Sequence, residues 1–330
     1  MVDTCKVIQI GVGSMGKRRI RNLNHLGFQN IDCFDIKSER VQFAAEKYSV
    51  RPIFDDNKIK WSEYSHIIIS TPPDVHMHYA KIGVENGLNT FVEASVTIDN
   101  MREVISLYNH RKKNFLLSPS CTMRFDPIVK KTKEIIDSNI LGKTLSINHY
   151  FGQYLPNWHP YESINDFYVS KKETGAAREI VPFDLVYLIW LFGDITQYNG
   201  YTKNTGHLGI GIDDIYCFNA VTADNAMLQM TIEVLSRVPI RETKVILENG
   251  YILLDIVKGV VSVFESNTQS WKYFKRNELS ETFSSEEMYV KELSCFMEAS
   301  LGKGNFPYTM EQDLKILETL EHIENKSIRL

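Results

Sequence analysis

Three glycines near the start of the chain have the spacing of a phosphate-binding turn. The run Gly11-Val12-Gly13-Ser14-Met15-Gly16 has the form G-x-G-x-x-G, follows a short β-branched run and opens an amphipathic segment. In that context the first glycine permits a tight turn, the second lets a pyrophosphate approach the backbone, and the third lets the helix pack closely on the strand. The first amides of the helix then supply donors and partial positive charge. The sequence therefore predicts a dinucleotide site that uses Gly11, Gly13, Ser14, Met15 and Gly16.

Asp35 stands where a dinucleotide-binding fold places its ribose-binding carboxylate. It ends the second apolar run, 19 residues beyond Gly16, and a carboxylate there accepts hydrogen bonds from the adenosine ribose hydroxyls. The same charge repels a 2′-phosphate, so NAD is predicted in preference to NADP. Lys37 and Arg40 lie close by in the sequence and leave NADP as the less favoured alternative. A plain tight turn beside a solvated strand end is the other interpretation.

Short apolar runs alternate with amphipathic segments over the first third of the chain. The predicted strands are 6–10, 31–35, 66–70, 90–93 and 115–118, and the predicted helices between them are 15–26, 38–47, 75–86 and 101–112. Such alternation favours parallel strands joined by right-handed crossover helices. We therefore expect an α/β fold with a Rossmann-type, doubly wound parallel sheet in residues 1–121, which would be the NAD-binding domain.

The character of the sequence changes after Arg124. Two helices are predicted, at 127–138 and within 174–192, and a strand-rich region follows from 196 to 274. Asn249-Gly250 lies between two strand-like runs there and is a strong hairpin signal. Two further helices, 286–299 and 310–325, end the sequence. We expect residues 122–330 to form an α+β domain on a mostly antiparallel sheet, for substrate binding and oligomerisation.

Composition and charge exclude several classes of protein. The 330 residues include 37 Lys and Arg against 41 Asp and Glu, giving a net charge of −4, so no nucleic-acid partner is expected. The longest apolar stretch, 185–193, is about half a membrane span, so no membrane association is expected. The five cysteines are scattered without a C-x-x-C pair, and we expect no metal site. The N-terminal stretch contains an acidic residue and lacks the character of a signal peptide. We therefore predict that the protein is located in the cytoplasm.

Several motifs together resemble those of the Gfo/Idh/MocA oxidoreductases, relatives of glucose–fructose oxidoreductase and inositol dehydrogenase. The resemblance spans nearly the whole chain and rests on GVGSMG at the start, STPPDVH at Ser70–His76, VEAS at Val92–Ser95 and the segment Gly175–Gly193. It implies a Rossmann domain, a C-terminal domain with an open-faced sheet, and homodimers or homotetramers formed through that sheet. The reaction it implies is hydride transfer between a nicotinamide and a hydroxyl-bearing carbon of a sugar or polyol.

The resemblance also implies further cofactor contacts. Ser70, Thr71 and Pro72 match the segment that lines the nicotinamide half of the dinucleotide. His76 falls where the family often carries a histidine near the following helix start, and a satisfied histidine in a helix-cap region is the alternative. Glu93 matches the acid of the family's Glu-Lys-Pro motif.

Two departures from the family pattern fall on its proton-handling residues. Ala94 and Ser95 stand where the family has lysine and proline. Farther along, Glu179 takes the place of the family's acid, but Phe183 holds the position of the histidine that serves as general acid and base. The resemblance therefore implies that the usual catalytic lysine and histidine are replaced.

One candidate source of replacement chemistry is the aromatic segment 152–162. Its aromatic and hydrogen-bonding side chains suit a sugar, because rings stack on apolar faces while polar groups contact hydroxyls. His159 is the natural candidate base there, with Tyr161 and Tyr154 as alternatives. Tyr154 and Trp158 are candidate substrate-binding residues. Packing at a domain interface is the other interpretation of this segment.

The second candidate source is the start of the apolar helix within 174–192. Glu179 could serve as the base, and Arg178 could clamp a carboxylate or phosphate with its forked donors. Asp184, a little over one turn later, could face the same substrate. The alternative is an ordinary ion pair near a helix start.

The function predicted from these residues is NAD-dependent hydride transfer at a CH–OH group of a sugar, amino sugar or nucleotide-linked sugar, with a small-molecule sugar as the partner. The alternative is a non-catalytic regulatory protein that binds NAD(H) or a sugar and has lost the family's catalytic residues. A third possibility is an enzyme that uses NAD without net oxidation.

Overall fold

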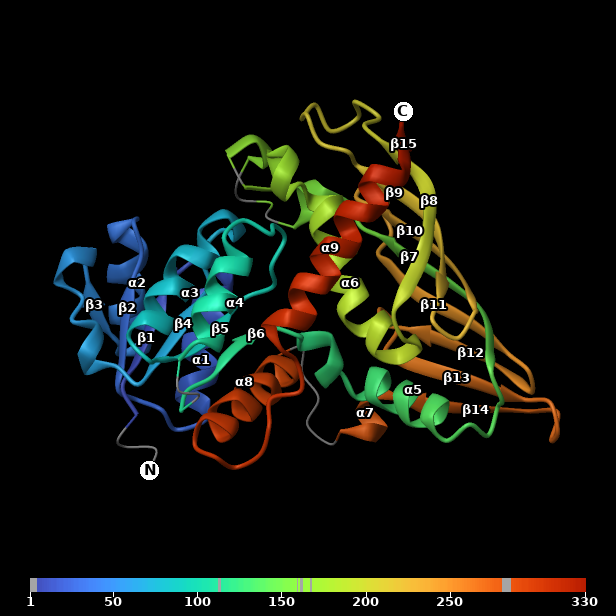
Figure 1. Ribbon diagram of the computed structural model, residues 1–330, viewed down its shortest axis with the longest axis horizontal. Coiled ribbons are helices and arrows are strands. Elements are labelled where there is room, and N and C mark those ends of the chain that lie inside the picture. The colour runs from blue at the N-terminus through green and yellow to red at the C-terminus, as the bar shows by residue number, and fades with distance from the viewer. Residues whose placement is uncertain (1–4, 112–113, 159, 161–162, 167, 281–285) are drawn as a thin grey trace. The chain divides into compact units, whose positions relative to one another are not determined.

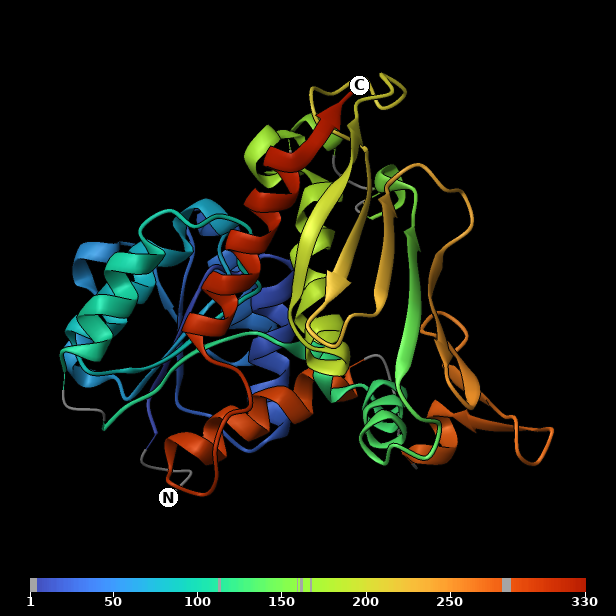
Figure 2. The same cartoon turned by 45° about the vertical axis from the view of Figure 1, so that its right-hand side comes forward.

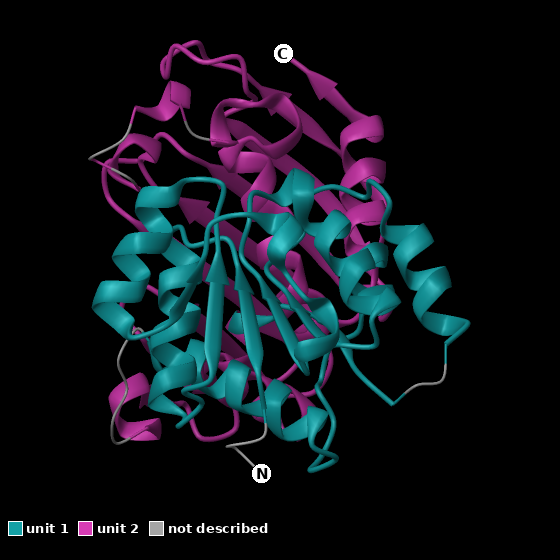
Figure 3. Cartoon of the chain, turned by 90° about the vertical axis from the view of Figure 1, so that its left-hand side faces the viewer, with its two compact units in different colours: residues 1–122, 284–315 teal, residues 123–283, 316–330 magenta. Residues whose placement is uncertain are grey.

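The structure is a computed structural model that describes residues 5–111, 114–158, 160, 163–166, 168–280 and 286–330. It divides into two compact units, which Figure 3 distinguishes by colour. The first unit comprises Met1–Thr122 and Ser284–Lys315, and the second comprises Met123–Phe283 and Ile316–Leu330. Residues 284–315, assigned above to the second domain, thus lie in the first unit. The reason is hydrophobic: Leu293, Phe296 and Met297 belong to the same buried cluster as the first strands.

The first unit is built on a parallel sheet. Its described strands follow the order β3-β2-β1-β4-β5-β6 (Figure 1). Their bounds are β1 Val7–Ile10, β2 Ile31–Phe34, β3 Arg51–Ile53, β4 His66–Ile69, β5 Asn89–Val92 and β6 Leu117–Pro119. The helices are α1 Ser14–His25, α2 Ser38–Tyr48, α3 His76–Glu85, α4 Met101–Asn109 and α8 Glu287–Ser300. The predicted doubly wound fold is confirmed.

The central strands lack polar alternation because they are buried along their whole length. All four residues of β1, β2 and β4 are buried, as expected for a parallel sheet that helices cover on both faces. The chain runs outward from β1 through β2 to β3, then returns to β4 on the other side of β1. This reversal between β1 and β4 creates the crevice at the carboxyl ends of the strands where such sheets bind ligands.

The second unit is built on a mixed sheet whose described strands follow the order β14-β13-β12-β11-β7-β10-β9-β8-β15. Their bounds are β7 Thr144–Gly152, β8 Ile195–Lys203, β9 Ile215–Thr222, β10 Met227–Glu233, β11 Ile240–Leu247, β12 Gly250–Asp255, β13 Val260–Glu265, β14 Ser270–Lys275 and β15 Ser327–Arg329. Within the described residues of this second sheet, only the pairs β10–β7 and β15–β8 are parallel. The predicted, mostly antiparallel sheet is therefore confirmed.

Helices cover this second sheet on one side. Helix α5 (Pro127–Asp137) packs near β12, β13 and β14, and α6 (Ala176–Phe192) packs near β9 and β10 (Figure 2). Helix α7 (Arg276–Leu279) packs near α5 and β14, and α9 (Met310–Lys326) begins in the first unit and ends in the second. Large apolar side chains are exposed on the strands, at Leu145, Tyr201, Met227, Ile246, Trp271 and Tyr273. The predicted hairpin joins β11 to β12, but Glu248-Asn249 forms its turn and Gly250 already pairs with Leu247.

Candidate functional site

The glycine turn connects β1 to α1 as predicted. Gly11 has a φ of +80°, and a Cβ there would lie 2.5 Å from the carbonyl oxygen of Ser70. A Cβ at Gly16 would lie 1.9 Å from the carbonyl oxygen of Gly11. Glycine is thus required at both positions, at the first by conformation and space and at the second by close helix–turn packing.

Gly13 differs from Gly11 and Gly16 because a Cβ atom would fit at this position. Of the described atoms, a Cβ at Gly13 would meet only Nη1 of Arg40 within 4 Å, at 3.7 Å. Gly13 is also the N-cap of α1, where no side chain of the described residues caps the helix and the first turn carries no acid. The first amides of α1 therefore lack side-chain acceptors, which is the condition for binding an anion there. The turn fits the pyrophosphate of a dinucleotide.

The two glycines predict opposite outcomes for the same substitution. Gly16→Ala should lower the free energy of unfolding by several kcal/mol, because backbone must move to admit the methyl group. Gly13→Ala should leave stability within about 1 kcal/mol, because its surroundings admit a Cβ. It should nevertheless weaken dinucleotide binding about tenfold or more, because the methyl group stands where the pyrophosphate approaches. Urea unfolding and calorimetric titration with NAD test both; equal stability and binding in the two variants would contradict this assignment.

Asp35 is held in place at the end of β2. Its Oδ2 accepts a hydrogen bond from the Val12 amide at 2.7 Å, and its Oδ1 accepts one from the Lys37 amide at 2.9 Å. Arg40 Nη1 lies 3.8 Å from Oδ2. A carboxylate offers about four acceptor positions, so Asp35 keeps capacity for the hydroxyls of a ribose.

Asp35 should control the choice between NAD and NADP. In Asp35→Ser the charge that repels a 2′-phosphate is lost, while Arg40 and Lys37 remain to attract it. We expect affinity for NADP relative to NAD to rise about tenfold or more. Parallel calorimetric titrations with the two cofactors measure this ratio, with Asp137→Ser, which removes an exposed carboxylate from the second unit, as the matched control. An unchanged ratio in Asp35→Ser would remove the role given to this carboxylate.

Buried polar atoms without protein partners gather near the ends of β4 and β5. Among the described residues, Thr71 Oγ1, His76 Nδ1 and Ser95 Oγ have no hydrogen-bond partner. His76 Nε2 bonds the carbonyl oxygen of Thr71 at 2.9 Å, and burial lowers the pKa of His76, which favours the neutral ring. Buried polar groups are rarely left unsatisfied. Their position after β4 and β5 fits the predicted nicotinamide-binding segment that begins with Ser70, Thr71 and Pro72.

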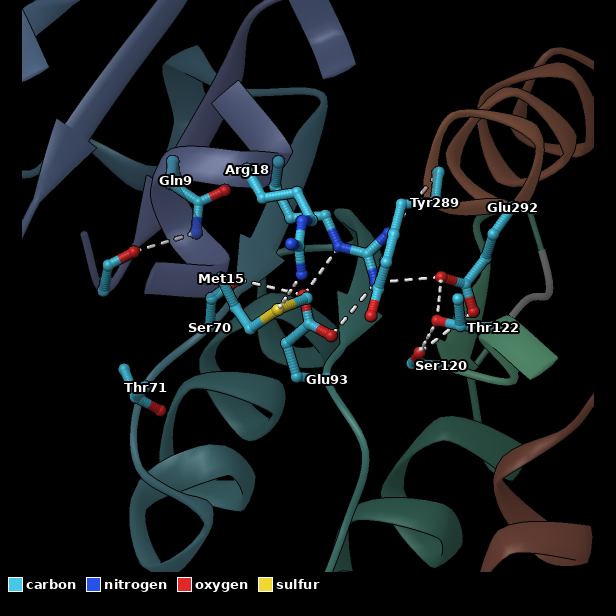
Figure 4. A network of polar contacts seen from close by, with 12 residues as sticks. Gln9, Met15, Arg18, Ser70, Thr71, Glu93, Ser120, Thr122, Tyr289 and Glu292 are labelled. Carbon is cyan, nitrogen blue, oxygen red and sulfur yellow. Dashed lines mark hydrogen bonds and ion pairs between the residues drawn. The ribbon is translucent and has the colours of Figure 1, made fainter. Parts of the chain in front are cut away.

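Glu93, labelled in Figure 4, directly follows β5 and is bound by a buried arginine, Arg19. Arg19 Nε lies 2.6 Å from Glu93 Oε1 and Arg19 Nη2 lies 3.0 Å from Oε2. The Ser70 hydroxyl also donates to Glu93 Oε1, at 3.2 Å. Arg19 itself is fully buried. Burial acts to lower the pKa of Arg19, but the charges of Glu93 and Glu292 outweigh it and raise that pKa further above its usual value.

The same arginine also binds Glu292 of α8. Arg19 Nη2 lies 2.8 Å from Glu292 Oε2, which also accepts from the Thr122 hydroxyl at 2.8 Å. The other oxygen, Oε1, accepts from the Ser120 hydroxyl at 2.9 Å and the Cys121 amide at 2.6 Å. Arg19 and Glu292 are not among the residues predicted from the sequence. One signal was present: Arg19 occupies a buried position of α1 beside Gly16, Ile20 and Leu23, where an apolar residue is usual.

In the second unit, Glu179 lies in the first turn of α6. The Tyr168 hydroxyl donates to its Oε1 at 2.8 Å, while its Oε2 is buried and has no partner among the described residues. Burial raises the pKa of Glu179 to about 7, against the opposing hydrogen bond from Tyr168. The carboxyl group is thus suited to exchange a proton near neutral pH. His159 and Tyr161, the other predicted catalytic residues, lie outside the described residues.

Arg178 forms hydrogen bonds with other residues of the second unit. Its Nε and Nη2 form a fork on Glu324, at 2.9 and 3.2 Å, and its Nη1 donates to the carbonyl oxygen of Glu173 at 2.8 Å. The Tyr216 hydroxyl donates to the same Glu324 at 2.9 Å. Arg178 therefore forms an ion pair of the kind weighed as the alternative, with Glu324 as its partner and not Glu179.

Asp184 lies one residue beyond Phe183 and is fully buried. Its Oδ2 bonds His149 Nε2 at 2.8 Å, and Arg241 forms an ion pair with the same carboxylate. Burial acts to raise the pKa of Asp184, but Arg241 and His149 outweigh it and hold that pKa below its usual value. The Arg241 guanidinium lies 5.1 Å from the centroid of the Phe183 ring. A cation thus lies beside the phenyl ring that the resemblance places at the position of the family's histidine.

The aromatic segment presents two further features. The Arg237 guanidinium lies 3.4 Å from the centroid of the Tyr154 ring. Trp158 Nε1 is buried and has no partner among the described residues.

No group of three or more His, Cys, Asp or Glu that could hold a metal ion occurs in the part of the chain that the structure describes. Likewise, no described helix is long and apolar enough to cross a membrane.

Both halves of the chain match families of known proteins. Residues 5–117 match the oxidoreductase family with an NAD-binding Rossmann fold, and residues 129–274 match the GFO/IDH/MocA C-terminal domain. Oxidoreductase YrbE of Bacillus subtilis is 27% identical over 138 residues, which are 40% of this chain and 40% of that protein. Oxidoreductase YhhX of Escherichia coli is 29% identical over 92 residues, 27% of this chain and 26% of that protein. The matched stretches thus span less than half the length of these curated relatives.

Solved structures share the whole architecture. A levoglucosan dehydrogenase in complex with NADH superposes with a TM-score of 0.85 at 15% identity, covering 98% of this chain and 96% of that one. A UDP-N-acetylglucosamine 3-dehydrogenase from Acidithiobacillus ferrooxidans gives 0.77 at 11% identity, covering 98% and 97%. At these identities the likeness establishes the fold. Together with the two family matches, it confirms the resemblance found in the sequence: the chain belongs to the Gfo/Idh/MocA family of oxidoreductases.

Proposed function

We propose that this protein is an NAD-dependent oxidoreductase that acts on a CH–OH group of a sugar, amino sugar or nucleotide-linked sugar. The observation that carries the proposal is the glycine turn, which leaves space beside Gly13 and uncapped amides on α1, with Asp35 fixed at the neighbouring strand end. A turn of purely structural use would need neither the space nor the placed carboxylate.

The first unit would bind the cofactor along the carboxyl edge of its sheet. The α1 amides would hold the pyrophosphate and Asp35 the adenosine ribose. Thr71, Ser95 and His76 would direct their partnerless polar atoms to the nicotinamide end. When bound, NAD supplies the acceptor or donor of the hydride. The protein's task at this edge is to orient the ring.

The reaction also needs a proton acceptor. Oxidation of a carbinol releases a hydroxyl proton, and a base with a pKa near the working pH takes it best. Glu179 meets that condition, with a pKa raised to about 7 and one oxygen without a described partner. Both oxygens of Glu93, by contrast, already accept hydrogen bonds, from Arg19 and from the Ser70 hydroxyl. His159 and Tyr161 stay predicted alternatives.

The substrate class is supported by the aromatic segment and by the relatives. Tyr154 and Trp158 offer ring faces, and the partnerless Trp158 Nε1 offers a donor for a hydroxyl. The two solved relatives are named for levoglucosan and for UDP-N-acetylglucosamine. Asp184 is fully buried and bonded to Arg241 and His149, so we propose that it positions Arg241 instead of touching substrate. Arg178 would likewise stabilise α6 through Glu324.

We also propose that the protein is a homo-oligomer in the cytoplasm. Apolar side chains such as Met227, Trp271 and Tyr273 are exposed on strands of the second sheet, and large exposed apolar patches commonly mark interfaces. The five cysteines are scattered along the sequence without a C-x-x-C pair, as suits a reducing compartment.

The test is an activity screen on the purified protein. NAD is supplied with levoglucosan, UDP-N-acetylglucosamine and free hexoses and hexosamines, and the nicotinamide absorbance is followed in both directions. We expect turnover with a member of this set that Glu179→Gln largely abolishes. Tight NAD binding with no turnover of any sugar in either direction would contradict the proposed activity and favour a regulatory protein.

A further inference from the structure

Arg19, Glu93 and Glu292 form a buried group in the first unit, the Arg19 cluster, in which one guanidinium serves two carboxylates among the described residues (Figure 4). Arg19 and Glu292 are fully buried, and the Glu93 side chain is 11% exposed. The three residues come from α1, the end of β5 and α8. A buried cluster with unequal numbers of positive and negative groups has an electrostatic effect on its surroundings.

Arg19 forms ion pairs with both Glu93 and Glu292, at 2.6 and 2.8 Å. Glu292 accepts from four donors, which are Arg19, the Ser120 and Thr122 hydroxyls and the Cys121 amide. Glu93 accepts from Arg19 twice and from the Ser70 hydroxyl. The Arg19 cluster therefore carries a net charge of about −1.

The charged groups next to the Arg19 cluster do not cancel this charge in the buried region. Arg18 and Arg21 both pair with Glu286, at 3.2 and 2.9 Å. Their side chains are 25% and 42% exposed and that of Glu286 is 34% exposed, so solvent screens them. The Tyr289 ring packs against the guanidinium groups of Arg18 and Arg19 and adds no charge.

The partly exposed member of the Arg19 cluster lies at the proposed nicotinamide edge. Glu93 immediately follows β5, and Ser70, which donates to it, immediately follows β4. Thr71, the next residue, has a hydroxyl without a described partner. Parallel sheets of this order bind the cofactor at the carboxyl ends of these strands. Glu93 is therefore the negative group placed to act on a nicotinamide ring there.

We propose that the Arg19 cluster stabilises the positively charged, oxidised nicotinamide relative to the neutral, reduced one. This inference rests on the proposed function. Arg19 keeps Glu93 ionised and fixed, and Glu292 adds the second negative charge that leaves the group anionic. Preferential binding of the oxidised form favours, in the bound complex, the direction in which a carbonyl substrate is reduced to the alcohol.

The test compares the dissociation constants of NAD⁺ and NADH by calorimetric titration of the full chain. In Glu292→Gln, which keeps the side-chain shape and removes the extra charge, we expect Kd(NAD⁺)/Kd(NADH) to rise about fivefold or more. Glu103→Gln is the matched control, because Glu103 belongs to the same unit but is 57% exposed and paired with Lys81. Its ratio should equal that of the wild type.

The wild-type protein provides a second test if the Glu292 variant does not fold. We expect it to bind NAD⁺ at least as tightly as NADH. A wild type that binds NADH more than about tenfold tighter, or a folded Glu292→Gln variant with the wild-type ratio, would overturn the inference while leaving the proposed function intact. Absence of binding by both forms would instead overturn the proposed function and the inference with it.

Discussion

Replacement of Arg19 by methionine will lower the free energy of unfolding by about 3–5 kcal/mol, the cost of breaking a buried ion pair by removing one partner. Methionine fills much of the same volume but leaves Glu93 and Glu292 close together without a cation. Glu292 cannot escape to solvent, because it is fully buried and bonded to Ser120, Cys121 and Thr122. The loss should therefore appear in full in urea unfolding followed by circular dichroism.

Arg21→Met is the matched control for this variant. Arg21 lies on the same helix and also pairs with a glutamate, Glu286, but its side chain is 42% exposed. Exposed ion pairs contribute little, so we expect a change within about 1 kcal/mol. If Arg19→Met were as stable as Arg21→Met, the Arg19 cluster would not be the stabilising feature described above.

Glu179→Gln will reduce turnover by about 10²- to 10⁴-fold while NAD binding stays unchanged, because it removes the proposed base and keeps its shape. The wild type should oxidise its substrate faster as the pH rises through about 7, where Glu179 loses its proton. Glu173→Gln, at an exposed position just before α6, is the control and should retain wild-type turnover. Turnover that survives in Glu179→Gln would transfer the role to His159 or Tyr161.

The same residue predicts a pH effect on stability that needs no substrate. The pKa of Glu179 is raised from its ordinary value of 4.5 to about 7 on folding. The unfolded state therefore loses this proton at lower pH than the folded state, and Glu179 costs stability as the pH rises between these values. Glu179→Gln should gain stability over the wild type across that range, by about 3 kcal/mol at pH 7. A constant difference from pH 4 to 8 would contradict the raised pKa.

The parts of the site that sequence predicted are those set by local order along the chain. The glycine turn and Asp35 follow from a strand, a tight turn and a helix that are adjacent in sequence. Glu179 became a candidate through its match to the family's acid and its place at the start of a long apolar helix. In each case the neighbours of the residue in sequence are also the neighbours that determine its conformation.

The Arg19 cluster could not be predicted in this way. Arg19 and Glu292 are 273 positions apart, and their contact depends on α8 joining the first unit instead of the second. The hydrophobic residues of α8 determine that choice, since Leu293, Phe296 and Met297 pack into the core around β1 and β2. Amphipathic periodicity shows that α8 buries one face, but it does not show which sheet covers that face.

The environment of Glu179 could likewise not be predicted from the sequence. Its pKa depends on burial and on the Tyr168 hydroxyl, and Tyr168 belongs to a short 3₁₀ turn, Tyr168–Ser170, within an irregular connection. Asp184 illustrates the same limit. Its position one turn after Glu179 suggested a substrate contact, whereas burial and the partners His149 and Arg241 give it a supporting place in the second unit.

The central claim, that the open glycine turn and Asp35 bind NAD, is tested most directly by calorimetric titration of the purified chain with NAD⁺, NADH, NADP⁺ and NADPH. The structure predicts that NAD⁺ and NADH bind, each more tightly than its phosphorylated counterpart, because Asp35 repels the 2′-phosphate. Absence of binding by all four would mean that the glycine turn is only a structural turn, and tighter binding of NADP⁺ and NADPH would contradict the role of Asp35.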